Sequence, residues 1–435
     1  RILADGVPGC RGSDGWSGLL SLRDATSAPE GESGMATGGR MIDLAIVGAG
    51  SAGAAAAWAA ASRGLSVVAL ERGPLDQAGA SWLNGVPEWS FVEAGLPVPI
   101  APVVHGDHTD AFHIIAGWGP TRVVIPKRDV LEIHMGHLVA DLQARARAAG
   151  AELREGVTVL GRTTRGLRTS DGPVHARWIL DAGGLAGPDL LGHGRVPRAT
   201  LCTAAQQCHD LADEGAARAW VDSQGAPWGD RLCFTGISTG YSILNVRVHA
   251  GEVAILTGAH ATGPRSGGQL LDDFVAAHPW IGAKRSGSRR AIPIGPPRRP
   301  LARGNVAALG DAAGQVFAAH GSGIGQQLVG ARILADALAA GEGVLGYMCR
   351  WESRFGPQLD ASAAFAELSR TLSPDQLARM MHAGLFVPAI VRATLEQHTP
   401  APGPLDLLRL VRGVAREPVL ARTLAVGAAR VVLGR

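Results

Sequence analysis

Residues 45–72 read AIVGAGSAGAAAAWAAASRGLSVVALER, and nineteen uncharged residues lie between Asp43 and Arg63. A transmembrane helix needs about 20 mostly apolar residues, so length alone admits a membrane span. The stretch reaches that length only by including three glycines and a serine, and glycine favours turns over helices. The glycine cluster therefore indicates a strand, a tight turn, a helix and a second strand.

This segment matches a dinucleotide-binding turn. Residues 48–53, GAGSAG, fit the pattern G-x-G-x-x-G and lie between an apolar run at 44–47 and an alanine-rich segment at 54–62 that predicts a helix. A second apolar run at 65–70 ends at Glu71, 18 positions after the last glycine of the motif. That spacing is close to the roughly 20 residues expected for the acidic residue that binds a ribose.

The residue types have physical reasons. The first glycine permits the tight turn, the second lets backbone N–H groups approach a pyrophosphate, and the third lets the helix pack on the strand. The phosphates then lie at the positive end of the helix, and an acid followed by arginine favours an ADP ribose with free hydroxyls. The cofactor contacts predicted here, for either FAD or NAD, are Gly48, Gly50, Ser51, Ala52, Gly53, Glu71 and Arg72.

A second glycine cluster lies far downstream, in residues 305–341, NVAALGDAAGQVFAAHGSGIGQQLVGARILADALAAG. Residues 306–309 read as a short buried strand, GDAAG at 310–314 ends it, and GSGIG at 321–325 opens a long helix rich in alanine and leucine. This arrangement implies a second contact with the dinucleotide.

In these residues the chain resembles the flavoproteins of the p-hydroxybenzoate hydroxylase fold, and among them the geranylgeranyl-reductase-like branch, which is related to flavin monooxygenases and halogenases. The resemblance implies FAD as cofactor, with Asp311 bonded to a ribityl hydroxyl and backbone N–H groups near Gly321 facing the pyrimidine end of the flavin ring. A third match is ARWILDAGGLAG at 176–187. The further cofactor contacts implied by the resemblance are Asp181, Gly310, Asp311, Gly321, Gly323 and Ile324, with Arg128 as a guess for the arginine of relatives.

The resemblance also shows departures. Ala318 stands where the family has proline, and His320 stands where small or hydroxyl residues are common. We consider His320, beside the flavin ring in the motif, and Tyr241, which begins a predicted strand, as candidate catalytic residues. His320 could move protons to the flavin or substrate because an unperturbed histidine titrates near pH 6.5; packing roles are the alternative for both.

Other clusters carry weaker signals. The stretch HGDHTDAFH at 105–113 has the letters of a metal site, but its spacing fits no ligand pattern, and we predict no metal. Seven basic residues and no acidic one lie between Lys284 and Arg303; this run could bind a phosphate or be a solvated loop.

The fold class expected is α/β, a Rossmann-like FAD-binding domain with an antiparallel-sheet substrate domain and a helical C-terminal region. The FAD-binding domain spans 41–345 in three segments, at about 41–75, 125–190 and 285–345. The inserted substrate domain takes about 76–124 and 191–284, where residues 241–258 read as a hairpin with its turn at Ala250-Gly251. Residues 1–40 are expected to be a disordered extension, and 346–435 form the helical region.

Composition limits the partners. The net charge of +3 gives no argument for nucleic acid. The five cysteines are scattered, without a CxxC pair, and the N-terminus lacks the apolar region of a signal peptide, so we expect a cytoplasmic protein. The predicted helix pair at 405–433 is rich in arginine, and either a peripheral membrane contact or a solvated face explains it. The sequence does not indicate an oligomeric state.

The sequence therefore predicts a FAD-dependent oxidoreductase. The first expectation is a reductase of carbon–carbon double bonds in an isoprenoid-like or other apolar substrate, with NAD(P)H as reductant. The alternative is a monooxygenase that hydroxylates an aromatic or polyketide-type compound. A non-catalytic or non-redox flavoprotein, similar to lycopene cyclases, is the second alternative. The halogenase motif W-x-W-x-I-P is missing from the sequence.

Overall fold

The glycine-flanked apolar runs form neighbouring strands of a parallel sheet. The computed structural model describes residues 41–106, 110–126, 128–238, 240–418 and 422. The sheet has the order β16-β17-β10-β1-β2-β7, and the contacts from β17 to β7 are all parallel. Its strands are β1 (Ile42–Val47), β2 (Val67–Leu70), β7 (Glu152–Arg154), β10 (Gly172–Asp181), β16 (Ala302–Arg303) and β17 (Val306–Ala308). An antiparallel pair, β8 (Val159–Thr163) and β9 (Gly166–Thr169), extends from β10.

Alanine allows the helices to pack closely on this sheet. In α1 (Ser51–Ala61) nine of the eleven residues are buried, and the helix contacts both α3 (Met135–Ala148) and α6 (Ile324–Ala339). The helix α7 (Gly343–Ser369) packs on α6 and adds large side chains to the same core. Because small side chains let helix backbones approach one another, the alanines of the uncharged stretch form a buried helix after β1 and the glycine turn. Along the described chain, no helix is both long and apolar enough to cross a membrane.

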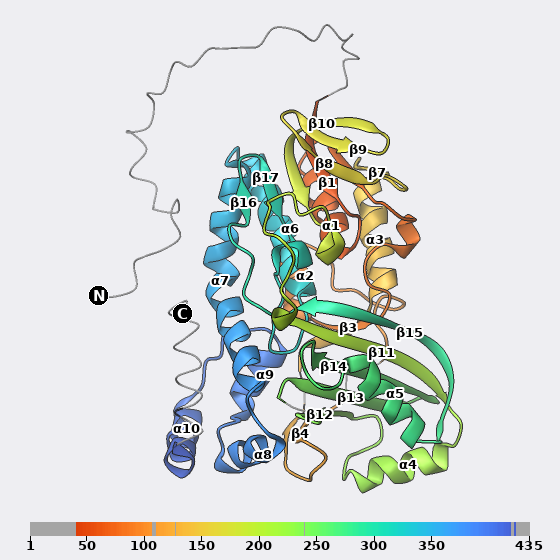
Figure 1. The fold of residues 1–435 in the computed structure, drawn as a ribbon, viewed down its shortest axis with the longest axis vertical. Coiled ribbons are helices and arrows are strands. Elements are labelled where there is room, and N and C mark those ends of the chain that lie inside the picture. The colour runs from red at the N-terminus through yellow and green to blue at the C-terminus, as the bar shows by residue number, and fades with distance from the viewer. Residues whose placement is uncertain (1–40, 107–109, 127, 239, 419–421, 423–435) are drawn as a thin grey trace, which may run out of the picture.

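A second sheet occupies the other half of the molecule (Figure 1). Its order is β15-β11-β14-β13-β12-β4-β5, with every pair antiparallel except β12 with β4. Its strands are β4 (Phe112–Ala116), β5 (Arg122–Ile125), β11 (Leu201–Leu211), β12 (Arg231–Thr235), β13 (Ser242–His249), β14 (Glu252–His260) and β15 (Ile281–Pro293). The helices α4 (Glu214–Ser223) and α5 (Gly267–Ala277) share an apolar core with one of its faces.

The predicted hairpin is confirmed as β13 and β14. His249 pairs with Glu252, so Ala250 and Gly251 form a two-residue turn, and both have positive φ, as such hairpin turns require. This meets the fold class predicted from the sequence: a Rossmann-like sheet beside an antiparallel sheet.

Shorter elements connect the two halves. The strands β3 (Leu83–Pro87) and β6 (Val130–His134) pair with each other, and α2 (Glu88–Ala94) follows β3. Single-turn helices are η1 (Leu75–Gln77), η2 (Gly184–Ala186), η3 (Arg198–Thr200) and η4 (Gly310–Ala313). Gln206 of β11 both donates to and accepts from the backbone of Leu83, at 2.9 and 2.6 Å, and so joins the second sheet to β3.

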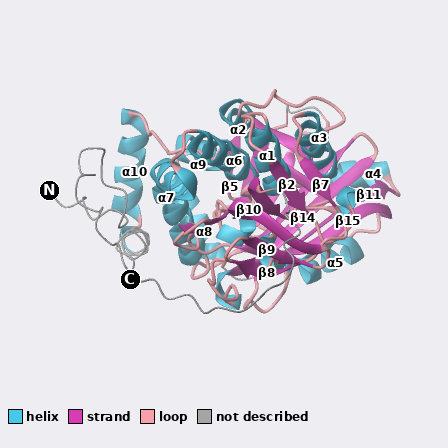
Figure 2. Ribbon diagram, turned by 90° about the horizontal axis from the view of Figure 1, so that it is seen from above, coloured by secondary structure: helices cyan, strands magenta, loops and turns pink. Residues whose placement is uncertain are grey.

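The C-terminal part of the described chain is helical. It contains α8 (Pro374–Ala383), α9 (Pro388–Leu395) and α10 (Pro404–Arg416), and α8 begins with the capping box formed by Ser373 and Gln376. Figure 2 shows α10 at the outer end of the molecule, away from both sheets. The predicted extension at 1–40 and most of the sequence after α10 lie outside the described residues.

Candidate functional site

The two glycine clusters line one cavity of about 680 Å³. The cavity lies where β1, β2 and β10 of the parallel sheet end, and residues from β15 also border it. The prediction that both motifs face a common crevice is therefore confirmed. The predicted cofactor contacts that line the cavity are Gly48, Gly50, Ser51, Ala52, Glu71, Arg72, Asp311, Gly321, Gly323 and Ile324.

Close backbone contacts require two of the glycines. Gly48 has a φ of +89°, and a Cβ there would lie 2.7 Å from the carbonyl oxygen of Ala182. Gly53 does not border the cavity, but a Cβ there would lie 2.0 Å from the carbonyl oxygen of Gly48. Its role is thus to bring α1 against the turn after β1, which is the packing role that the sequence predicted.

Both α1 and α6 direct uncapped N-termini at the cavity. Neither helix has a capping side chain or an acidic residue in its first turn. Their first N–H groups and their positive ends are therefore left for an anionic or electron-rich ligand. The Oγ of Ser51 donates to the Oε1 of Gln327 at 3.0 Å, so the two helix ends are joined directly.

Glu71 is fixed at the end of β2. Its Oε2 accepts a hydrogen bond from the backbone N–H of Ala49 at 2.9 Å, and its Oε1 accepts one from Gly73 at 3.3 Å. The carboxylate therefore borders the cavity with a defined orientation, as the binding of ribose hydroxyls requires. Arg72 donates to the carbonyl of Ala186 at 3.3 Å, and both residues border the cavity.

Asp311 borders the cavity from η4. Burial raises the pKa of this carboxyl to about 6, and the positive charge of Arg290 opposes the rise. Its carboxylate has no hydrogen-bond partner within the described ranges, which leaves both oxygens to accept from a ligand. Hydrogen bonds of Gln315 fix the turn that carries Asp311. Gln315 accepts from the N–H of Gly310 at 2.8 Å and donates to Tyr347 of α7 at 2.9 Å.

These residues fit FAD. Two uncapped helix ends suit the diphosphate and the flavin ring, Glu71 suits the adenosine ribose, and Asp311 suits the ribityl hydroxyls. Trp82 also borders the cavity, and its Nε1 is buried without a hydrogen-bond partner in the described part of the chain. An orphaned donor beside a cavity is accounted for when a ligand accepts its hydrogen bond.

Asp181 and Gly310, two of the predicted cofactor contacts, are not among the residues that border the cavity. Asp181 instead accepts from the N–H groups of Gly183 and Leu190 at 3.1 and 3.0 Å, and burial raises the pKa of its carboxyl. The carboxylate thus holds the loop after β10, and the backbone of that loop borders the cavity in its place.

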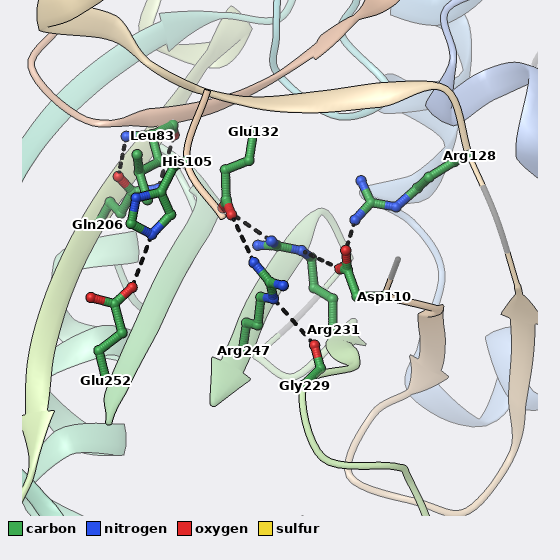
Figure 3. Close-up of polar contacts among 10 residues, drawn as sticks. All are labelled: Leu83, His105, Asp110, Arg128, Glu132, Gln206, Gly229, Arg231, Arg247 and Glu252. Atoms are coloured by element: carbon green, nitrogen blue, oxygen red, sulfur yellow. Dashed lines mark hydrogen bonds and ion pairs between the residues drawn. The ribbon is translucent and has the colours of Figure 1, made fainter. Parts of the chain in front are cut away.

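Arg128, the guess for the arginine of relatives, does not border the cavity either. Figure 3 shows its guanidinium directed at Asp110, to which it donates at 3.0 Å, and it lies 4.9 Å from the centre of the Phe112 ring. It follows β5, so the chain is still beside the second sheet at this point. Arg128 therefore belongs to a different set of residues.

That set is a buried ionic cluster, which we call the Glu132 cluster (Figure 3). Glu132 of β6 lies 3.0 Å from Arg231 of β12 and 3.3 Å from Arg247 of β13. Burial alone would raise the pKa of Glu132, but the two arginines outweigh it and the pKa is lowered. Asp110 is placed against both Arg128 and Arg231. The cluster joins β6 to the face of the second sheet that is opposite α4 and α5.

The histidine and aspartate side chains described in residues 105–113 do not gather at one point. His105 pairs with Glu252 at 2.9 Å and His113 with Asp230 at 2.9 Å, while Asp110 belongs to the Glu132 cluster. Asp107 and His108 lie outside the described residues. Across the described residues, no group of three or more His, Cys, Asp or Glu side chains could hold a metal ion.

Of the two candidate catalytic residues, His320 lies in the loop before α6, and Tyr241 contacts that loop. The Tyr241 hydroxyl donates to the carbonyl of Ala318 at 2.7 Å, and burial raises its pKa well above 10. His320 precedes the cavity residue Gly321 without bordering the cavity itself, and its ring centre lies 5.2 Å from that of Phe317, with the two rings tilted by 39°. Burial, with a smaller contribution from the charge of Arg128, lowers the pKa of His320 to about 4, and its buried Nε2 has no described partner.

Sequence reasoning missed several cavity residues. Trp82, Asn84, the turn at 77–80 and Arg290 border the cavity, but none lies in a recognisable motif. Only Arg290 could have been suspected from the sequence, because it belongs to the basic run at 284–303. In the structure it donates to the carbonyl of Gly79. Other arginines of that run form separate ion pairs, for example Arg289 with Asp272 and Arg299 with Glu352, so the run is not one phosphate site.

Comparisons with known proteins agree with this cavity. The family described as FAD dependent oxidoreductase matches residues 43–96, which contain the first glycine cluster. Digeranylgeranylglycerophospholipid reductase 2 from Methanopyrus kandleri is 26% identical over 363 residues, which cover 75% of this chain and 87% of that protein.

Solved structures show the same fold. A geranylgeranyl bacteriochlorophyll reductase-like protein from Thermoplasma acidophilum has a TM-score of 0.70 at 16% identity, covering 90% of this chain and 100% of that chain. A probable FAD-dependent monooxygenase from Pseudomonas aeruginosa has a TM-score of 0.57 at 17% identity, covering 78% of this chain and 99% of that chain. One fold thus serves both kinds of oxidoreductase.

Proposed function

We propose that this protein, a FAD-dependent oxidoreductase with the fold of geranylgeranyl-reductase-like proteins, reduces carbon–carbon double bonds in an isoprenoid-like or other apolar substrate. The reductant would be NAD(P)H. The similarity to a reductase that spans most of both chains supports the reaction class, and the apolar surroundings of the cavity support the substrate class.

The observation that carries the proposal is the apolar lining beside the second glycine cluster. Ile292 of β15, Leu309, Val316 and Ile324 border the cavity there. Behind Ile292, buried apolar side chains that include Ile294 and Ala318 pack against it. A hydrocarbon chain gains free energy by leaving water for such a surface, at roughly 25 cal/mol per Å².

The residues of the chain would divide the work as follows. Glu71, Asp311 and Trp82 hold the cofactor, whose ring supplies hydride transfer when bound. The uncapped end of α6 stabilises negative charge near Gly321. Tyr241 positions the loop at Ala318 through its hydrogen bond and does not exchange a proton, because its hydroxyl is committed to a backbone carbonyl.

We assign His320 a hydrogen-bonding role. With its pKa lowered to about 4, the ring is neutral near pH 7 and cannot act as an imidazolium acid. A neutral ring still offers one N–H, and because His320 does not border the cavity, this N–H would act within the loop that carries Gly321 and not on the cofactor or the substrate directly. The proton added to the reduced substrate would then come from water.

The monooxygenase alternative rests on the fold shared with the Pseudomonas aeruginosa protein. The decisive experiment reduces the FAD-loaded protein without oxygen and adds a geranylgeranyl lipid. We expect the lipid to oxidise the flavin, which visible absorbance measures. The mass spectrum should then show a lipid with fewer double bonds.

The outcome against the proposal is equally clear. A flavin that stays reduced with the lipid, but oxidises rapidly in air while an aromatic compound gains a hydroxyl, would establish the monooxygenase. The two results cannot be confused, because only the first proceeds without oxygen.

A further inference from the structure

The helix α10 presents an apolar face to solvent. Its exposed side chains include Leu407, Leu408, Val411 and Val414, with 50, 45, 66 and 45% of their surface exposed. These positions recur at i, i+1, i+4 and i+7, so they form one stripe along the helix. Contiguous exposed apolar surface of this kind marks an interaction site.

The opposite side of α10 packs against the protein. Gly413 is its buried residue, and a Cβ there would lie 2.9 Å from both the Ala383 carbonyl oxygen and the Leu385 Cδ2. At about 100° per residue, Leu408 and Val411 lie about 140° and 160° around the axis from Gly413. The apolar stripe therefore faces away from the molecule, and Figures 1 and 2 place α10 at its outer edge.

Arginines line one flank of this stripe. Within α10, Arg409, Arg412 and Arg416 stand against a single acid, Asp406, which lies 3.5 Å from Arg409. Long arginine side chains can keep their charge at a polar boundary while their stems cover apolar surface. An apolar stripe bordered by positive charge complements an anionic lipid surface, with its acyl chains below and its phosphates at the boundary.

We propose that α10 lies in the headgroup region of an anionic phospholipid membrane and attaches the protein to its surface. The arginine flank favours this occupant over a second copy of the chain, because two such faces would bring like charges together. The inference does not depend on which reaction the cavity performs, although an apolar lipid substrate would be delivered from the same surface.

The test uses the full chain loaded with FAD and sedimentation with vesicles. One set of vesicles contains phosphatidylcholine alone, and the other also contains phosphatidylglycerol. We expect binding to the anionic vesicles, and L408D/V411D should weaken it at least tenfold at any salt concentration. R412Q/R416Q should weaken it about fivefold for each arginine at low salt, and less at high salt.

A matched control is Leu160→Asp. Leu160 is 54% exposed and belongs to β8, a strand that Figure 1 shows at the other end of the molecule from α10, so this variant should bind vesicles like the unmodified chain. Flavin absorbance checks that each variant is folded. Failure of the unmodified chain to bind anionic vesicles, or equal binding by L408D/V411D, overturns the proposal. A dimer that L408D/V411D converts to monomer, without vesicle binding, would identify a second copy as the occupant.

Discussion

Many of the residues that border the FAD cavity are glycines and alanines, whereas the Glu132 cluster consists of long charged side chains. Around the cavity, backbone atoms approach so closely that an added methyl group has no space, as at Gly53, which packs α1 against the turn after β1. In the Glu132 cluster, charges balance one another in a place that water reaches poorly. The first region should therefore be sensitive to volume and the second to charge.

The largest effect should come from removing the charge of Glu132. The change Glu132→Gln keeps the shape but leaves two buried arginines without their main counter-charge, so we expect the protein to lose about 3–5 kcal/mol of stability. Thermal unfolding monitored by circular dichroism measures the loss. Because the pKa of Glu132 is lowered in the folded protein, its contribution is complete above about pH 4.5 and declines as the pH falls below that value.

The control is Glu214→Gln, in an exposed pair with Arg218 on α4. Surface ion pairs contribute little, so this change should stay within about 0.5 kcal/mol. Equal losses of stability in both variants would show that the buried charge of Glu132 matters no more to stability than an exposed one.

The next largest effect should come from adding one methyl group beside the cavity, and it should appear in the affinity for FAD. In Gly53→Ala the Cβ would lie 2.0 Å from the Gly48 carbonyl oxygen, so α1 or the turn must move. We expect FAD affinity to fall about a hundredfold, since displaced N–H groups no longer face the diphosphate. Quenching of flavin fluorescence measures the dissociation constant.

Gly119→Ala serves as the comparison, because a Cβ at Gly119 makes only an ordinary contact of 3.5 Å. FAD binding by this variant should match that of the unmodified chain. An undiminished affinity in Gly53→Ala would contradict the predicted sensitivity to volume.

A smaller effect is expected at His320. His320→Leu removes the N–H and should slow flavin oxidation by the substrate about tenfold, while His320→Gln retains a donor and should keep most of the rate. Because the pKa of His320 is about 4, the rate should show no step between pH 5 and 8 that depends on this residue. Stopped-flow absorbance in both variants tests the assignment, and a step near pH 6.5 that is lost in His320→Leu would refute it.

The smallest effect concerns Asp311 before FAD binds. Its folded pKa of about 6 exceeds the unfolded value of 3.8, so the ionised carboxylate costs stability, and the cost grows as the pH rises between these values. The apoprotein of Asp311→Asn should thus be more stable than the unmodified apoprotein at pH 8, and the difference should shrink as the pH falls toward 4. Melting curves at both pH values measure this, and the same variant should bind FAD more weakly.

The two regions also differ in how far the sequence reveals them. The cavity contacts around Gly48 and Gly321 were predictable, because each cluster is a short local motif whose backbone does the binding. Asp311 could be placed for the same reason. The cavity residues Trp82 and Arg290 could not, since their positions depend on where the second sheet packs against the first.

The Glu132 cluster was not predictable at all. Arg231 and Arg247 come from adjacent strands, and Glu132 comes from β6 about a hundred residues earlier in the chain. Arg128 was only a guess for the arginine that relatives carry, and in the structure an ion pair with Asp110 decides the direction of its side chain. Side chains that meet only through tertiary packing are not marked by any characteristic spacing in the sequence.

The most direct test is the stoichiometry and affinity of FAD in Gly50→Val and Gly323→Val, each compared with the unmodified chain by titration. The added side chains would meet the Gly79 Cα and the Gln315 carbonyl oxygen, in different motifs. If both helix ends hold one cofactor, the unmodified chain binds one FAD and each variant alone loses it. Full FAD binding by either variant would contradict a cofactor held between the two clusters.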